Sequence, residues 1–272
     1  MSIAATFRAF PTLFRVSFAE AVAYRAEMFV WVFSTTMPLI MLMLWTTVTT
    51  VAPVEGRGGH VWSADDFSAY FLSVFIVRQL ISAWASWEIN FEVRRGNLAM
   101  RLLRPMHPVI GYAVGNLAYL PLRTIVTLPV VAILIATQGG KLPTDWRIWA
   151  LWCVAMFGSW LINFFVNVAV GALSFYLESS LKLMEVWLAL FFVSAGYLFP
   201  LEVVKVQWVR TLIDVLPFRY IISLPAELMT GRLSIDEAWR AIGIQYAWGV
   251  GAFVVSLIIW SRGVKRFQSF GG

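Results

Sequence analysis

Charged residues with a distinctive spacing lie between residues 90 and 108, and they are Glu92, Arg94, Arg95, Arg101 and Arg104. Within this stretch, Leu98, Leu102 and Leu103 recur at helical spacing, which predicts a short amphipathic helix. Gly96 permits a turn into this helix, and Pro105 ends it. A short helix with an apolar ridge and a basic face is typical of a segment that docks onto another protein.

Other forms of site chemistry find little support in the sequence. The chain has one cysteine, Cys153, and two histidines far apart in sequence, His60 and His107, so it offers no disulfide and no predicted metal site. No catalytic triad or pair of cleft carboxylates is recognisable. The run Gly139-Gly140-Lys141-Leu142 lacks the spacing and the hydroxyl of a phosphate-binding loop. We therefore expect no enzyme activity and no ATP site in this chain.

Arg78 falls near the middle of a long apolar segment, where a charge is costly. It could line a substrate path by contacting an anionic substrate or by acting as a gate. The alternative, which the cost of an unpaired charge favours, is a structural ion pair or a bond to helix carbonyls. Arg123 lies in another apolar segment, from which its long side chain can reach toward the membrane surface.

The composition indicates which elements carry these residues. Hydrophobic residues make up 60% of the 272 positions and charged residues 13%, against about 25% charged in a typical soluble domain. The apolar residues form long blocks, which predicts a polytopic membrane protein. The net charge of +6 comes mostly from residues between these blocks, so it predicts membrane topology rather than nucleic-acid binding.

The sequence predicts an all-α fold with six transmembrane helices, at about residues 28–51, 67–87, 109–137, 148–176, 183–199 and 241–260. Residues 1–26 are amphipathic, with Phe14, Phe18 and Val22 on one stripe, and predict an interfacial helix on the membrane surface. Pro38 should kink the first span.

Residues 200–240 are expected to form outer re-entrant helices between spans five and six. Pro200, Pro217 and Pro225 divide this segment into pieces too short to cross a membrane. Ser234 and Glu237 have the spacing of a capping box that starts the last span.

Basic residues predict the orientation of the chain. Six spans place both termini and the 88–108 segment on one side, and their arginines and lysines assign that side to the cytoplasm. The outer segment argues against this with Lys205, Arg210, Arg219, Arg232 and Arg240. We follow the two tails and the short loop, because all three agree.

Three features together resemble the permease subunits of ABC exporters of the ABC-2 type, in a compact subgroup formerly catalogued as a domain of unknown function. The first comprises Glu92, Arg94-Arg95, Gly96-Asn97-Leu98 and Leu103-Arg104-Pro105, although one residue separates Leu103 from Pro105 where the family commonly has two. The second is Gly196-Tyr197-Leu198-Phe199-Pro200-Leu201 followed by Leu216-Pro217-Phe218. The third is the amphipathic N-terminal segment before a six-span core.

The resemblance covers the whole chain and implies a single transmembrane domain, residues 1–272. It implies a dimer of permeases, more often with a different permease than with a copy of itself, above two separate ATPase chains that bind ATP and Mg²⁺. The implied location is the cytoplasmic (inner) membrane of a bacterium, among membrane lipids. The coupling segment would be residues 88–108, with the residues Glu92, Arg94, Arg95, Gly96, Leu98, Leu102, Leu103 and Pro105.

The substrate does not follow from the sequence, since the family handles lipids, glycan precursors, peptides and drugs. An ATPase-independent secondary transporter and a membrane assembly protein are the alternatives. The sequence shows no internal repeat of the kind found in many secondary transporters.

Overall fold

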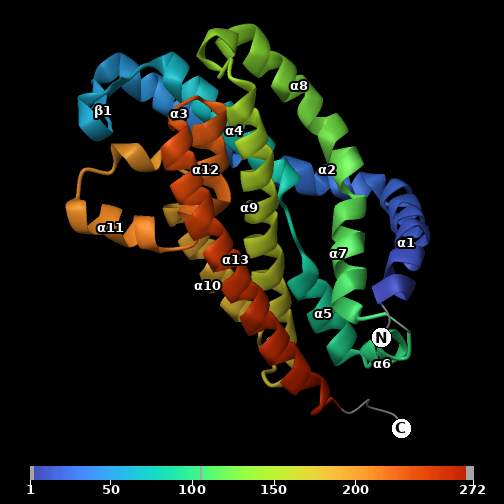
Figure 1. Ribbon diagram of the computed structural model, residues 1–272. Coiled ribbons are helices and arrows are strands. Elements are labelled where there is room, and N and C mark those ends of the chain that lie inside the picture. Colours follow the sequence, from blue (N-terminus) through green and yellow to red (C-terminus); the bar gives the residue numbers. More distant parts are fainter. Residues whose placement is uncertain (1–2, 105, 268–272) are drawn as a thin grey trace.

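The computed structural model describes residues 3–104 and 106–267, and most of it is helical (Figure 1). In the first half of the chain the helices are α1 (Ile3–Ala23), α2 (Arg25–Ser34), α3 (Met37–Val51), α4 (Ala64–Leu80), α5 (Ala85–Arg94), α6 (Leu98–Leu102), α7 (Pro108–Ala118) and α8 (Leu120–Gln138). The second half holds α9 (Trp146–Ala172), α10 (Leu181–Ser194), α11 (Gln207–Val215), α12 (Arg219–Met229) and α13 (Ile235–Val264). Short 3-10 turns cover Arg57–Gly59, Gly139–Lys141, Leu173–Phe175 and Leu201–Val203, and β1 (Val54–Glu55) pairs antiparallel with β2 (Val61–Trp62).

The predicted all-α class is confirmed, and four helical segments are long and apolar enough to cross a membrane. They are Ala64–Arg94, Pro108–Lys141, Trp146–Phe175 and Ile235–Val264, which correspond to predicted spans two, three, four and six. The regions of predicted spans one and five hold shorter helices, α3 and α10. Crossing of the membrane by those two regions stays a prediction.

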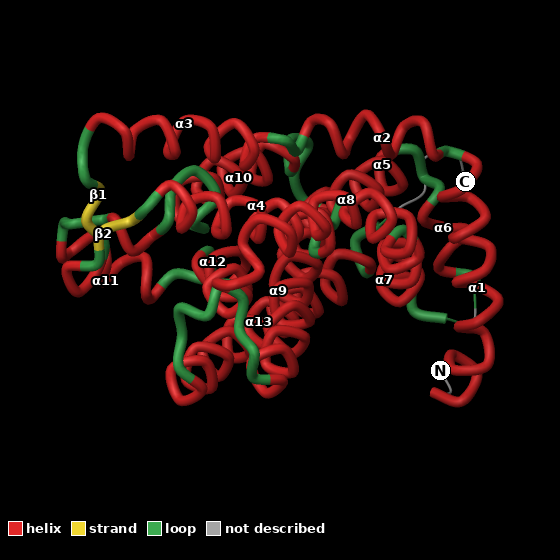
Figure 2. Tube along the Cα trace, turned by 90° about the horizontal axis from the view of Figure 1, so that it is seen from above, coloured by secondary structure: helices red, strands yellow, loops and turns green. Residues whose placement is uncertain are grey.

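Predicted span one is not a single kinked helix, because the chain breaks between α2 and α3 at Thr35 and Thr36. Pro38 stands in the first turn of α3 rather than inside a helix. This place suits proline, since the backbone N–H that it lacks would have no partner in a first turn. Figure 2 shows α2 and α3 lying end to end along one edge of the molecule.

Two further predicted spans are interrupted. The chain leaves helical geometry between Leu80 and Ala85, which separates α4 from α5, and it bends at Tyr119 between α7 and α8. Polar side chains bond the exposed backbone at the first break. Asn163 on α9 donates a hydrogen bond to the carbonyl of Ile81 (2.8 Å). By contrast, α9 and α13 are continuous over 27 and 30 residues.

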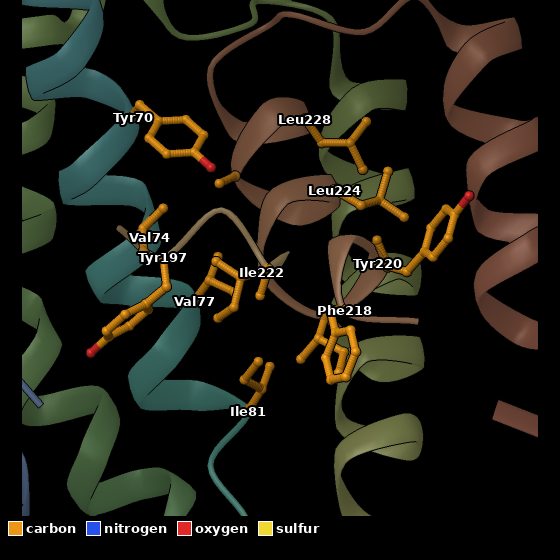
Figure 3. Packing of buried hydrophobic residues seen from close by; sticks show 14 of the residues in the cluster. Tyr70, Val74, Val77, Ile81, Tyr197, Phe218, Tyr220, Ile222, Leu224 and Leu228 are labelled. Atoms are coloured by element: carbon orange, nitrogen blue, oxygen red, sulfur yellow. The ribbon is translucent and has the colours of Figure 1, made fainter. Parts of the chain in front are cut away.

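The upper core joins α4, α9 and α12. Figure 3 shows Tyr70 and Val77 of α4, and Ile81 just after it, on the side of α12 that carries Ile222, and all four side chains are buried. Every residue of α12 from Tyr220 to Met229 is buried, so this short helix is enclosed by protein.

A second core lies toward the end of the molecule where α6 and the last turns of α13 are found (Figure 1). Ile89 of α5, Leu98 of α6, Tyr112 of α7, Phe164 of α9 and Trp260 of α13 all contribute buried side chains to it. This core fixes the base on which the basic residues of the 90–108 stretch stand.

A network of ion pairs joins the start of α4 to Lys141 and to residues 200–240. Asp66 at the start of α4 contacts Lys141 (2.8 Å) and Arg232 (3.5 Å), and Arg232 also contacts Glu202 (3.0 Å). Ser63 caps α4 in a capping box with Asp66. The predicted capping box of Ser234 and Glu237 is confirmed at the start of α13.

Candidate functional site

The basic linker, which we define as residues 88–108, is a helix, a tight turn and a second short helix. Gly96 makes the turn after α5 with a φ of 75°, a conformation that glycine adopts without strain. The helix that follows, α6, covers Leu98–Leu102, so it is shorter than the predicted stretch from Gly96 to Pro105. Pro105 lies outside the described residues.

Glu92 is held inside the linker by two partners. Arg101 Nε donates to Glu92 Oε1 (2.7 Å), and the hydroxyl of Tyr112 donates to Glu92 Oε2 (2.6 Å). Arg101 also donates to Glu88 (2.6 Å) and stacks over the Tyr112 ring at 4.4 Å. The Glu92 side chain is 13% exposed. These contacts tie α5, α6 and α7 together through charge-assisted hydrogen bonds.

Electrostatics favour the charged form of Arg101. Burial acts to lower its pKa, but the attraction of Glu88, Tyr112 and Glu92 outweighs burial, so the net pKa is raised. Arg101 therefore bonds within the linker as a fixed cation, and its guanidinium is already engaged by two carboxylates.

The leucines of the linker divide between two faces. Leu98 is fully buried in the second core, and Leu102 packs against that core. Leu103 is 80% exposed and Met100 is 68% exposed. The sequence grouped Leu98, Leu102 and Leu103 on one ridge, but the structure places Leu103 outside it, because one further residue of helical rotation turns Leu103 away from Leu98 and Leu102.

The exposed residues form what we call the linker surface: Phe91, Arg94, Arg95, Met100, Leu103 and Arg104. The Arg95 guanidinium stacks over the Phe91 ring at 4.0 Å, which holds an apolar side chain and a charge side by side. Exposed apolar groups rimmed by arginines mark a protein-interaction surface.

The linker is also bonded to the turn between α9 and α10. Arg94 donates to the carbonyls of Leu177 (3.2 Å) and Glu178, and Asn90 donates to the Ser180 hydroxyl (2.8 Å). The structure joins this turn to the linker, so the two would be presented together.

Arg78 and Arg123 meet at the break between α4 and α5. Arg78 Nη1 donates to the Ser82 hydroxyl (2.7 Å), and Arg123 Nη1 donates to the carbonyls of Ser82 (3.1 Å) and Gln79 (3.3 Å). Gln79 in turn donates to Thr35 at the break between α2 and α3 (2.8 Å). Arg123 thus bonds to the end of a helix and does not extend away from the bundle.

The comparison with known families settles the membership of the chain. A profile described as ABC-2 family transporter protein matches residues 27–271. The chain belongs to the ABC-2 transporter family. No curated protein sequence matches it significantly.

Membership identifies the chain as a transport subunit with several membrane-spanning helices, rather than an enzyme. Permeases of the ABC-2 family typically work with an ABC ATPase. In this ABC-2 transporter protein, the linker combines a rigid base with an exposed apolar and basic surface.

A cavity of about 250 Å³ lies beside the linker of the ABC-2 transporter protein, where α1 packs on α7. Its lining includes Glu20 from α1, Glu88 from α5, and Arg101 and Arg104 from the linker. The N-terminal helix α1 therefore contributes to the surroundings of the linker, which its amphipathic sequence alone did not predict. Pro11 lies inside α1, because the helix already begins at Ile3.

Sequence reasoning missed several residues that position the site. Tyr112 gives no sign in the sequence that its hydroxyl bonds Glu92, because the two are 20 residues apart. Met100 could have been found, since it lies on the face of α6 opposite Leu98 and Leu102. Arg123 was recognised as an unusual charge, but its contact with α4 depends on tertiary packing.

Proposed function

We propose that this chain is the permease subunit of an ATP-driven ABC exporter and that a separate ATPase docks on the linker surface. The observation that carries the proposal is the exposed set of Phe91, Met100 and Leu103 beside exposed arginine side chains, on a segment rigidly bonded to the bundle. Family membership supplies the class of partner.

The residues of the linker divide into two roles. Leu103, Arg94 and Arg95, with Met100 and Phe91, are the contact residues. Glu92, Gly96, Leu98 and Leu102 are positioning residues, because they fix the turn and anchor it in the second core. The sequence predicted one uniform set of coupling residues, which also includes Pro105. We propose instead that the first group contacts the partner and that the second group positions the first.

The proposed mechanism begins at the partner. ATP and Mg²⁺ bind to the ATPase, and closure of the ATPase pair moves the linker. Because α5 packs closely on α9, the movement passes to the longest described helices. Gly171 of α9 permits the close approach of α5 to α9, since a Cβ at this position would lie 2.9 Å from Ile89 Cβ and 3.0 Å from Ser86 Cα. Arg78 lies at the helix breaks along the proposed substrate path.

The proposed setting follows the positive-inside rule and the family resemblance. The linker and both termini face the cytoplasm of a bacterium, and residues 200–240 lie at the outer side of its cytoplasmic membrane. The chain forms a single domain with six spans, and α1 rests at the membrane surface. A second, different permease completes the dimer.

The docking proposal is tested with the variant Met100→Asp/Leu103→Asp. Burial of two carboxylates at the ATPase interface removes them from water at a cost in binding free energy. Copurification with the ATPase encoded beside the permease should therefore fall about tenfold or more. Both side chains are exposed, so the thermal midpoint of the permease should not change. Val206→Asp, at an exposed apolar residue of the outer segment, is the matched control.

Normal copurification and normal ATPase stimulation by the double variant would show that the linker surface is not the docking site. If vesicles that contain the permease but no ATPase still move substrate across their membrane, the secondary-transporter alternative is favoured instead.

A further inference from the structure

We propose that Arg78 and Arg123 form an anion-binding site that holds the charged group of an amphipathic, lipid-like substrate. This inference rests on the proposed exporter function, because it names the substrate class of that path. The two arginines come from different helices, α4 and α8, and both hydrogen-bond to Ser82 at the break after α4.

The two positive charges are not balanced by acidic side chains. Other partly buried arginines are paired: Arg101 with Glu88 and Glu92, Arg219 with Asp214 and Glu227, and Arg232 with Asp66 and Glu202. Among residues 3–104 and 106–267, no ion pair joins a carboxylate to Arg78 or to Arg123. The Nε atom of Arg78 is buried and has no hydrogen-bond partner.

Stabilisation of the α4 terminus does not account for two arginines. The carbonyl end of a helix attracts cations, but this attraction is several times weaker than the cost of removing a guanidinium from water. One arginine bonding the terminal carbonyls would satisfy them, and Arg123 already does so. Ser82 and Tyr197 bond Arg78 only through neutral hydroxyl groups. Its charge is therefore left for another partner, and the neighbouring charge of Arg123 makes an anion the favourable one.

The surroundings suit an anion within an otherwise apolar region. Trp84 stacks with Arg123 at 4.8 Å, and Phe191 lies 5.7 Å from Arg78, so aromatic rings flank the two guanidinium groups. The breaks in three helical segments converge here through the bonds from Gln79 to Thr35 and from Arg123 to Ser82. Broken helices at a converging point are a common way of building substrate sites in transporters.

The position of the pair indicates what is attached to the anionic group. Arg78 and Arg123 lie in two of the long apolar segments, where a small hydrophilic anion would have to leave water completely. An anion that carries an apolar chain enters such a region at a lower cost. A single-chain amphiphile with an anionic head therefore fits better than a small hydrophilic anion.

The test measures equilibrium binding of radiolabelled dodecyl phosphate to the full-length permease in phosphatidylcholine nanodiscs. Dodecanol is the uncharged probe with the same tail, and empty nanodiscs give the background. We expect wild-type protein to bind dodecyl phosphate at least tenfold more tightly than dodecanol. Arg78→Gln/Arg123→Gln should remove this preference, whereas Arg78→Lys/Arg123→Lys should retain most of it, because lysine keeps the charge.

Arg240→Gln is the matched control, since it removes an exposed arginine at a distance in the sequence. Equal binding of dodecyl phosphate by the wild type and the double glutamine variant would overturn the anion site. So would loss of the preference in the lysine variant with a wild-type thermal midpoint, because positive charge at these two positions would then not account for the preference. If the glutamine variant unfolds, displacement of radiolabelled dodecyl phosphate is measured on the wild-type protein instead. We expect dodecyl sulfate, a second anionic amphiphile, to displace it more effectively than inorganic phosphate does. Equal displacement by the two competitors would count against the site.

The same preparations separate this inference from the proposed function. Copurification with the ATPase depends on the linker surface and not on Arg78 or Arg123. Loss of anion binding with ATPase association intact supports both assignments. If the permease keeps its preference for the anion but no ATPase associates with it, the exporter proposal is overturned and the binding site still stands.

Discussion

At the scale of single residues, Glu92 has a role that its charge alone does not reveal. It is the acceptor for Arg101 and Tyr112, so it fixes the angle between α5 and α7 instead of facing solvent. The pattern of one glutamate and several arginines correctly identified an important segment. It did not distinguish the residues that touch a partner from those that position them, since that depends on which way each side chain turns after Gly96.

Glu92→Gln should lower the stability of the permease. The new amide can still accept a hydrogen bond from Tyr112, but it carries no charge. Arg101 then keeps only Glu88 as an ionic partner. We expect a loss of about 1–3 kcal/mol, seen as a lower thermal midpoint in nanodiscs. Glu185→Gln, at an exposed position of α10, is the control and should leave the midpoint unchanged. An unchanged midpoint for Glu92→Gln would contradict the positioning role.

At the scale of the elements, the sequence predicted apolar segments well and their interruptions poorly. Long apolar blocks identify candidate spans because membrane crossing demands about 20 apolar residues. The breaks after Leu80 and at Thr35 depend on partners distant in sequence, such as Asn163 and Arg123, which satisfy the freed backbone groups. No local pattern reports such partners, so the breaks could not be predicted from one sequence.

Gly171→Ala should disturb the contact between α5 and α9. A methyl group there would press on the Ser86 backbone and the Ile89 side chain, and overpacking of this kind costs about 1–3 kcal/mol. We expect a lower thermal midpoint and weaker stimulation of the ATPase, measured on the same preparation. Gly251→Ala, where an added Cβ meets no atom within 4 Å, should be neutral or slightly stabilising. Equal behaviour of the two variants would argue against close α5–α9 packing.

At the scale of the whole molecule, two cores are joined by α9 and α13. The upper core gathers α4 and α12, and the second core gathers α5, α6 and α7. The all-α class and the family were predictable from composition and motif order, but the enclosure of α12 within the upper core was not. The prediction that Pro225 divides this segment was wrong, because Pro225 lies inside α12. The local sequence predicted only a re-entrant helix.

Membrane topology is tested by cysteine labelling in a Cys153→Ala background. Leu103→Cys should react with a membrane-impermeant maleimide only in inverted vesicles, because the linker is proposed to face the cytoplasm. Val206→Cys should react in intact cells, because residues 200–240 are proposed to lie outside. Both side chains are exposed, so lack of access within the fold would not explain a negative result. Labelling of Leu103→Cys from outside would reverse the proposed orientation.

The continuity of α9 has a mechanical consequence. At 1.5 Å per residue, its 27 residues span about 40 Å, and no proline interrupts them. One end lies beside the linker and the other follows the turn that carries Lys141, which is bonded to Asp66. If the helix pivots as a stiff rod about its linker end, a tilt of about 5° displaces the far end by roughly 3 Å over that length. Such a displacement is about the length of one hydrogen bond, enough to separate the ion pairs at the opposite side of the molecule.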